Sequence, residues 1–329
     1  MGRVLILFLA MASLVSTFII PQAMAQSAST RAVAFMSHRF GEDQFPSTNI
    51  RVEHFEKQLN FLAENNFNIL SLEEIVGALK NDTHLPDKSV AITIDDAYRS
   101  VYEVAYPLLK QHGFPFTVFI APKTVDQGIK AYMDWQQVRE MHDDGVTFAN
   151  HSLNHDYLIR RKDGESDEVW AERVTTDIEM AQQRLREELG SAPALFAYPY
   201  GEFNLELMEI VEALGYTAFG QHSGSIGPLS DPRALPRFPM AEAFADMASF
   251  KIKAMSLPMA VVQQDPVDPQ TQANRPSLTL TLASSDADLE QLACYLGSNQ
   301  LRIRWVTPGE VFRVQADEDL PPGRSRYNC

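Results

Sequence analysis

Acidic and imidazole side chains follow two apolar segments of the sequence that have the composition of buried strands. Two adjacent carboxylates, Asp95 and Asp96, come directly after Ser89–Ile94, which is rich in β-branched residues. A later apolar segment is followed by His151 and His155. Carboxylates next to a buried strand are costly unless they are paired or bound to a metal. Two histidines four residues apart are typical of a chelating pair on one face of a helical turn.

One carboxylate and two imidazoles make a three-ligand set that leaves coordination positions open for water. Such a set is typical of a catalytic zinc site, because structural zinc sites fill all four positions with protein ligands. The second carboxylate is then free to act as a general base. An aspartate pair alone is also common at helix N-termini, but both groups at the ends of neighbouring strands favour a metal centre. We expect zinc, with cobalt, nickel or iron as alternatives, because one Asp and two His suit several divalent ions.

Repeated strand and helix segments must position these side chains. Ser71 and Glu74 form a capping box at the start of one predicted helix. Asp134 predicts the N-cap of another, and Ser166–Leu189 is a long amphipathic helix. About six or seven such units, with strands that are apolar throughout, predict a parallel sheet in a barrel-like β/α domain. An open doubly wound sheet is the alternative, but no glycine-rich phosphate loop follows any strand.

The N-terminal segment is typical of a secretory signal peptide. Arg3 precedes an apolar run over Val4–Ile20, and Ala23–Ala25 provides a small-residue cleavage site. A membrane anchor is the alternative, but the run is near the lower length limit for a spanning helix. We therefore expect residues 1–25 to be removed and the protein to be exported, periplasmic or secreted, with no stable membrane span left.

The rest of the chain divides by composition into a large domain, a linker and a small appendage. The predicted ranges are 26–257 for the domain that carries the metal motifs, 258–276 for a linker rich in Gln, Asp and Pro, and 277–329 for a β-rich appendage with period-two alternation. Export permits a disulfide, and Cys294 and Cys329 are the two cysteines of the sequence. We expect them to pair, and two separate thiols are the alternative.

Composition and charge narrow the classes of partner. The chain has 329 residues, 45% hydrophobic and 22% charged, and its formal net charge is −15. Such a composition is ordinary for a folded soluble protein. An acidic chain is a poor candidate for binding nucleic acid or an anionic membrane. A neutral or cationic ligand is compatible with this charge.

Three motifs resemble those of the polysaccharide deacetylases of carbohydrate esterase family four, the nodulation-protein-B homology group. Thr93–Tyr98 (TIDDAY) resembles the first motif, His151–His155 (HSLNH) the second, and Phe196–Gly201 (FAYPYG) the third. They occur in the family's order, and the resemblance covers roughly residues 31–255. It implies a distorted (β/α) barrel and metal-dependent removal of N-acetyl groups from amino-sugar polymers, such as chitooligosaccharides or poly-N-acetylglucosamine.

The resemblance also implies roles for individual residues. It carries Asp95 over as the general base, and it carries Asp96, His151 and His155 over as ligands of a zinc-like ion. The backbone N–H of Tyr200 would help to stabilise the oxyanion. Adjacent strand residues point to opposite faces, so the two aspartates can share one site only if the strand ends or twists between them.

The sequence departs from the family pattern in two places. The family usually has an arginine in the third motif that holds the base aspartate, and here that position is Ala197. Arg237 is our candidate replacement. The family's late Leu-x-His acid motif is also missing. The segment AVAFMSH resembles the exported poly-N-acetylglucosamine deacetylases, which have that histidine at the end of the first strand. We therefore expect His38 to be the general acid, with His222 as second candidate.

Several aromatic and imidazole side chains are candidates for contact with a sugar. Tyr98, Trp135, Tyr200 and His222 are the predicted substrate-binding residues, although packing beneath its helix is the alternative for Trp135. The expected partner is a glycan that contains N-acetylglucosamine, and nothing in the sequence indicates a protein partner. Two other functions stay open: a glycan-binding protein on an inactive deacetylase scaffold, and an O-acetyl carbohydrate esterase.

Overall fold

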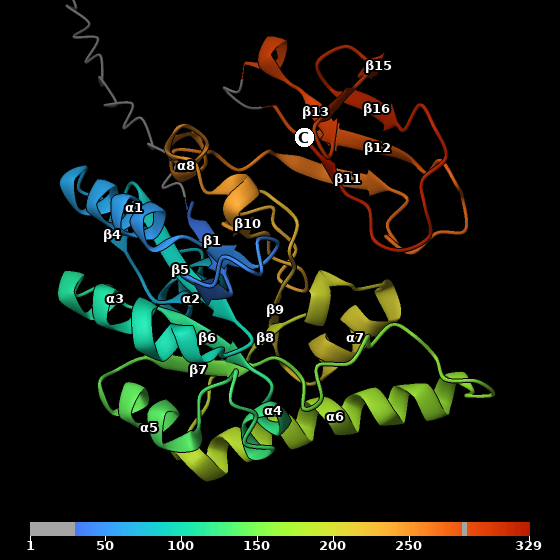
Figure 1. Cartoon of the computed structure of the whole chain (residues 1–329). Coiled ribbons are helices and arrows are strands. Elements are labelled where there is room, and N and C mark those ends of the chain that lie inside the picture. Colours follow the sequence, from blue (N-terminus) through green and yellow to red (C-terminus); the bar gives the residue numbers. More distant parts are fainter. Residues whose placement is uncertain (1–29, 285–287) are drawn as a thin grey trace, which may run out of the picture.

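A curled parallel β-sheet lies at the centre of the molecule (Figure 1). The structure is a computed structural model that describes residues 30–284 and 288–329, so the predicted signal segment over residues 1–25 lies outside it. The strand order is β10-β1-β5-β6-β7-β8-β9, β4 also pairs with β5, and every pair is parallel. The strands are β1 (Val33–Ser37), β4 (Asn68–Ile69), β5 (Ser89–Asp95), β6 (Thr117–Ile120), β7 (Thr147–Asn150), β8 (Leu195–Ala197), β9 (Thr217–Phe219) and β10 (Phe238–Pro239). This architecture confirms the predicted barrel-type β/α fold.

One buried cluster takes side chains from several strands of the sheet. Ala34, Ala91 and Ala149 lie in one buried cluster with Phe119 and Phe219. Beyond β9 the chain forms a loop and returns beside the same strand. There the amide of Gly220 donates to the carbonyl of Leu235 at 2.9 Å. It then enters β10, which pairs with β1 at the opposite edge of the sheet. The two edges are thus joined by a short stretch of chain, and the carboxyl ends of the strands surround one opening.

Helices pack around this sheet, and α2, α5 and α6 begin at the positions predicted from the sequence. The helices are α1 (Val52–Glu64), α2 (Leu72–Asn81), α3 (Tyr106–His112), α4 (Pro122–Asp126), α5 (Trp135–Asp143), α6 (Asp167–Leu189), α7 (Leu205–Ala213) and α8 (Met247–Ala254). Ser71 and Asp134 form the capping boxes of α2 and α5, and Ser166 caps α6. A short parallel pair, β2 (Arg39–Phe40) with β3 (Asn49–Ile50), lies beside β1 in the chain.

The C-terminal part of the chain forms two small antiparallel sheets with their own apolar core around Phe312 and Cys294. One has the order β11-β12-β16-β15 and the other β14-β13-β17. The strands are β11 (Val261–Asp265), β12 (Ser277–Leu282), β13 (Cys294–Leu296), β14 (Asn299–Leu301), β15 (Arg304–Thr307), β16 (Val311–Gln315) and β17 (Tyr327–Asn328). A disulfide joins Cys294 to Cys329.

The structure differs from the prediction of a linker over residues 258–276. Strand β11 lies inside that range and pairs with β12. The strand is at the edge of its sheet, and four of its five residues are exposed. An exposed edge strand needs no alternation of apolar residues, so its sequence has none of the pattern that predicts a strand.

Candidate active site

The two aspartates share one site because the backbone reverses its handedness at the end of β5. Asp95 is the last residue of the strand, and the next two residues, Asp96 and Ala97, have φ values of 74° and 53°. Left-handed backbone is uncommon for residues other than glycine and is found where a site requires it. The amide of Asp96 still donates to the carbonyl of Phe119 at 3.0 Å. The twist therefore brings both carboxylates to the same end of the sheet.

The two histidines lie on an irregular loop after β7. The prediction that they share a helical turn was wrong, because Ser152 and His155 both have positive φ. The side chain of Asn150 stabilises the loop instead, since its Oδ1 accepts from the amide of Ser152 at 2.9 Å. The Ser152 hydroxyl in turn accepts from the amide of His155 at 3.0 Å. This local pairing brings the two imidazole rings to a centroid distance of 4.7 Å.

Asp96, His151 and His155 form a cluster that could hold a metal ion. Oδ1 of Asp96 lies 3.0 Å from Nε2 of His155 and 3.5 Å from Nε2 of His151, and one ligand atom from each residue lies within 4.8 Å of the others. Burial alone would raise the pKa of Asp96, but the two imidazoles beside its carboxylate hold that pKa well below its usual range.

One observation tests whether these residues fit a metal. Nδ1 of His151 lies 2.7 Å from the carbonyl of Ala197, which fixes the hydrogen on that nitrogen. Nε2 of the same ring is buried and has no hydrogen-bond partner among the described residues. A buried acceptor that faces a carboxylate and a second imidazole, with its other nitrogen anchored to a carbonyl, is the arrangement of a metal-ligating histidine. The donor set therefore fits a zinc-like divalent ion.

Asp95 faces a different partner. Its two oxygens accept from Nη1 and Nη2 of Arg237 at 2.7 and 2.8 Å, and both side chains are 0% exposed. Burial would raise the pKa of Asp95, but the guanidinium beside it, together with His151, holds that pKa below its ordinary value. Arg237 also donates from Nε to the carbonyl of Gly220 at 3.0 Å and from Nη1 to the hydroxyl of Thr93 at 3.1 Å. Asp95 is thus kept charged and in a single orientation.

The third motif brings Tyr200 to the same opening. Tyr200 has a φ of 60°, and its ring lies 4.5 Å from that of His155 and 3.9 Å from that of Tyr157, on which it stacks. Gly201 follows with a φ of +66°, and a Cβ there would lie 2.5 Å from the side chain of Gln221. Only glycine lets the backbone approach so closely at this point.

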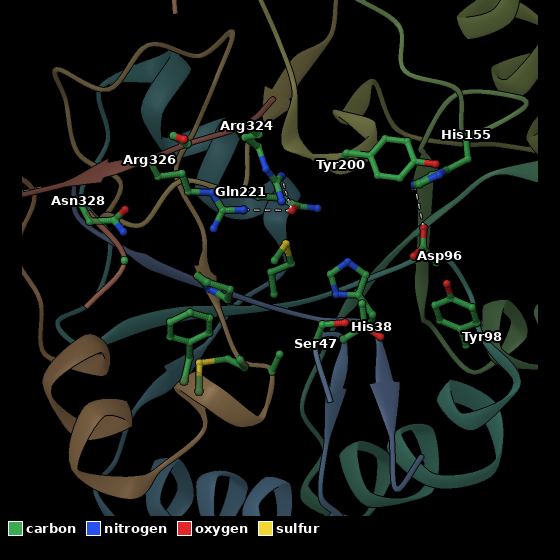
Figure 2. A pocket seen from close by; sticks show the side chains of 18 of the residues that line it. His38, Ser47, Asp96, Tyr98, His155, Tyr200, Gln221, Arg324, Arg326 and Asn328 are labelled. Atoms are coloured by element: carbon green, nitrogen blue, oxygen red, sulfur yellow. Dashed lines mark hydrogen bonds and ion pairs between the residues drawn. The ribbon is translucent and has the colours of Figure 1, made fainter. Parts of the chain in front are cut away.

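A cavity of about 1010 Å³ connects these groups (Figure 2). His38, Asp96, Tyr98, His155 and Tyr200 all line it. His38 directly follows β1, as predicted, and burial lowers its pKa although Asp96 and Asp95 act in the opposite direction. The predicted acid, ligands and sugar-contacting tyrosines therefore face the same space from four different strand ends.

The structure places two predicted substrate-binding residues outside this lining. Trp135 donates from Nε1 to Asp126 at 2.7 Å and lies under the guanidinium of Arg184 at 4.8 Å, so it packs beneath its helix. The ring of His222 packs 5.9 Å from that of Phe203. Its apolar surroundings explain why burial, with help from nearby arginines, lowers its pKa to about 4. Neither side chain lines the cavity of Figure 2.

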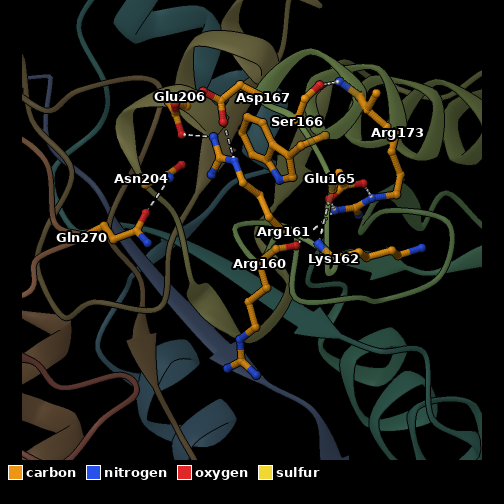
Figure 3. Close-up of polar contacts among 12 residues, drawn as sticks. Arg160, Arg161, Lys162, Glu165, Ser166, Asp167, Arg173, Asn204, Glu206 and Gln270 are labelled. Carbon is orange, nitrogen blue, oxygen red and sulfur yellow. Dashed lines mark hydrogen bonds and ion pairs between the residues drawn. The ribbon is translucent and has the colours of Figure 1, made fainter.

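Ion pairs fasten the loop that follows His155 to its surroundings (Figure 3). Arg161 donates to Asp167 and to Glu206, both at 2.8 Å. Arg173, on α6, donates from Nε to Glu165 at 2.6 Å. The loop that follows His155 is thereby joined to the first turn of α6 and the first turn of α7.

The residues that the segment leading into β17 contributes to the cavity were not predicted from the sequence. Arg324, Arg326 and Asn328 line it together with Gln221. Nη1 of Arg324 donates to Oε1 of Gln221 at 3.0 Å. No motif or periodicity marks these residues, because the contact joins positions 103 residues apart. The predicted disulfide at Cys329 was the one available sign that the end of the chain is held in place.

Among residues 30–284 and 288–329, no helix is both long and apolar enough to cross a lipid bilayer.

Comparison with known proteins agrees with this fold. Residues 82–219 match the family model described as polysaccharide deacetylase, so the chain carries a polysaccharide deacetylase domain. The family predicted from the three motifs is thereby confirmed.

Individual proteins with similar sequences or structures include deacetylases. The chain is 26% identical over 223 residues to the poly-β-1,6-N-acetyl-D-glucosamine N-deacetylase of Escherichia coli (57% of this chain, 33% of that one). It is 27% identical over 190 residues to the enzyme of the same name from Staphylococcus aureus (56% and 64%). The IcaB structure from Ammonifex degensii superposes with a TM-score of 0.60 at 25% identity (69% and 97%). The chain thus spans between a third and two thirds of the length of these two curated relatives.

Proposed function

We propose that the protein is a metal-dependent hydrolase that removes N-acetyl groups from glycans containing N-acetylglucosamine. One observation carries the proposal: the cluster of Asp96, His151 and His155 lies next to a buried, charged Asp95. A lone carboxylate cluster would suit many proteins. A ligand set with a separate, oriented base suits hydrolysis. The curated relatives named as poly-β-1,6-N-acetyl-D-glucosamine N-deacetylases support the same substrate class.

Each side chain has a distinct part in the proposed reaction. A divalent ion held by the ligand cluster would polarise the acetyl carbonyl and lower the pKa of water. Asp95 accepts the proton of the attacking water, and Arg237 keeps its carboxylate oriented during that transfer. The backbone N–H of Tyr200 donates to the developing oxyanion. His38 donates a proton to the leaving amine, so that the products are acetate and a free amino sugar.

The pairing of Asp95 with Arg237 weighs against the alternative of an inactive glycan-binding protein. That alternative was motivated by Ala197, where the family usually has an arginine. Arg237 supplies a guanidinium to the same carboxylate at 2.7 and 2.8 Å, so the base has its partner. Proton transfer from an acid is less demanding when the leaving group is an alcohol, so an O-acetyl esterase remains the second candidate activity.

Acetate release from neutral oligomers of N-acetylglucosamine, linked β-1,4 or β-1,6, tests the proposal. We expect release by the full chain, its loss on chelation and its return with added zinc. Asp95→Asn and His151→Ala should each abolish release, and His151→Ala should also lower the amount of zinc bound per chain. Asp163→Asn and His84→Ala, at exposed positions of the same residue types, are the matched controls.

Three outcomes would contradict the proposal. Full activity of the Asp95→Asn and His151→Ala variants would remove these residues from the mechanism. Glycan affinity without acetate release, whatever metal is added, would favour the binding protein instead. Faster release from O-acetylated sugars than from N-acetylated ones would favour the esterase.

A further inference from the structure

Two arginines from the segment between β16 and β17 line the cavity, and neither has a carboxylate partner among the described residues. Arg324 and Arg326 line the same cavity as Asp96 and His155, and both approach Oε1 of Gln221, at 3.0 and 3.5 Å (Figure 2). Among the described residues, neither guanidinium lies within 4.0 Å of an acidic oxygen. Two positive charges thus converge on one neutral amide, in a chain whose net charge is −15.

No acidic side chain in the described part of the chain compensates the charge of this arginine pair, of which Arg324 is exposed and Arg326 half-buried. Partial burial lowers the pKa of both groups, that of Arg326 to about 10, where the neighbouring Arg324 adds to the effect. Glu202 attracts Arg324 from a distance, but its own carboxylate lies 3.4 Å from Arg160. Both arginines stay protonated at neutral pH, and an anion that entered the cavity would stabilise them.

A third side chain of the same segment also has an unused polar atom. Asn328 lines the cavity, and its Oδ1 is buried with no hydrogen-bond partner among the described residues. Buried polar atoms are nearly always paired in folded proteins. This unpaired oxygen has almost no accessible surface, and the side chain that carries it lines the cavity. Asn328 lies on β17, whose pairing with β13 and whose neighbouring disulfide at Cys329 hold the segment in place.

The arginine pair is close to the chemistry. A Cβ added to Gly201 would lie 3.0 Å from Nη1 of Arg324, so the guanidinium reaches the third motif directly beside Tyr200. The cavity of about 1010 Å³ is at the upper end of the volumes that hold small ligands, which leaves space for more than one sugar ring.

We propose that Arg324 and Arg326 form a subsite for a carboxylate carried by the sugar next to the one that is deacetylated. The inference rests on the proposed function and narrows its substrate to acidic glycans in which N-acetylglucosamine alternates with a carboxylate-bearing sugar. A guanidinium binds a carboxylate through two parallel hydrogen bonds, and Asn328 bonds to a hydroxyl of the same sugar. The carboxylate has two sources, a uronic acid ring or a lactyl ether on a hexosamine.

The experiment compares three tetrasaccharides on the full chain. They are a neutral β-1,4 N-acetylglucosamine oligomer, one alternating with glucuronic acid, and one alternating with N-acetylmuramic acid. We measure kcat/KM for acetate release and, separately, the affinity of each oligomer by calorimetry. The wild type should prefer at least one acidic oligomer to the neutral one, and which one identifies the source of the carboxylate.

Arginine variants then test the subsite itself. Arg324→Gln with Arg326→Gln should lower the acidic-to-neutral ratio of kcat/KM by about tenfold to a hundredfold, the usual cost of losing a charged hydrogen bond. Lysine at both positions should restore part of the ratio, and added salt should lower the wild-type preference. Arg304→Gln, an exposed arginine of the C-terminal sheets away from the cavity, is the control.

The outcomes separate the subsite from the proposed function. No acetate from any oligomer, with acidic oligomers still bound through the arginines, would refute the deacetylase and keep the subsite. Acetate release with no preference for either acidic oligomer would overturn the subsite and keep the deacetylase. A loss shared equally by neutral and acidic oligomers in the glutamine variant would also overturn it, because the arginines would then serve only the packing of the segment.

Discussion

Replacing Arg237 by glutamine should destabilise the protein far more than the loss of one surface ion pair would. The side chain forms two parallel bonds to Asp95 at 2.7 and 2.8 Å, and both partners are completely buried. Glutamine is too short and uncharged, so Asp95 would be left buried without a counter-charge. Asp95 would respond by taking up a proton, because burial alone raises its pKa.

The magnitude follows from the burial of both partners. Breaking a buried ion pair from one side costs about 3–5 kcal/mol of unfolding free energy, out of a total of about 5–15 kcal/mol for a typical domain. The matched control is Arg233→Gln. Arg233 pairs with Asp231 at 2.7 Å, but the two side chains are 27% and 41% exposed. Such a pair contributes about 1 kcal/mol or less.

Urea unfolding, followed by circular dichroism, measures the difference. We expect the order wild type, Arg237→Lys, Arg237→Gln, because lysine keeps the charge but cannot donate two parallel bonds. Adding Asp95→Asn to Arg237→Gln should recover part of the lost stability, since the buried charge is then gone. Equal losses for Arg237→Gln and Arg233→Gln would refute the reasoning, and so would a double variant less stable than the single one.

Two further predictions concern the C-terminal sheets and the helix beneath the site. Cys329→Ser should destabilise the sheet of β13 and β17 by about 3–4 kcal/mol, as expected for a closed loop of this length, and hydrogen exchange should rise there while β5 stays protected. Rapid exchange throughout the molecule would contradict this separation. Trp135→Phe should leave kcat/KM unchanged within about twofold and cost about 1 kcal/mol through the lost bond to Asp126, measured by acetate release and thermal unfolding. A tenfold rise in KM would instead indicate that Trp135 contacts the sugar.

Local sequence patterns predicted the features that depend on residues close together in the chain, such as helix caps and buried strands. The capping boxes at Ser71 and Asp134 begin helices as expected, because a cap involves four consecutive residues. The apolar strands predicted the parallel sheet, since a strand buried on both faces has a continuous apolar sequence. Asp96 and His151 were expected at the ends of neighbouring strands, but they follow β5 and β7, with β6 between them. They still meet, because parallel strands put all their carboxyl ends on one side of the sheet.

Contacts between distant segments could not be predicted in this way. The loop at His151 departs from a helical turn because the side chain of Asn150 accepts from the backbone amide two residues further on. The sequence alone does not show whether an Asn side chain makes such a bond. The approach of Arg324 to Gln221 depends on how two sheets pack. Trp135 was assigned to a sugar cleft by residue type, but its helix directs the ring toward Asp126 and Arg184 instead.

The Asp95–Arg237 pair joins distant segments of the chain, so the order in which the strands assemble decides when Asp95 acquires its partner. Arg237 follows Asp95 by 142 residues, and the strand directly after it, β10, joins the sheet at the far side of β1. Bringing together such distant segments is slower than pairing local ones, so β5 and its neighbours can assemble before the guanidinium arrives. Until then Asp95 lacks the partner that keeps it charged and oriented. A chain whose sheet is incomplete would therefore lack the guanidinium that orients Asp95, the base of the proposed reaction, until β10 joins the sheet.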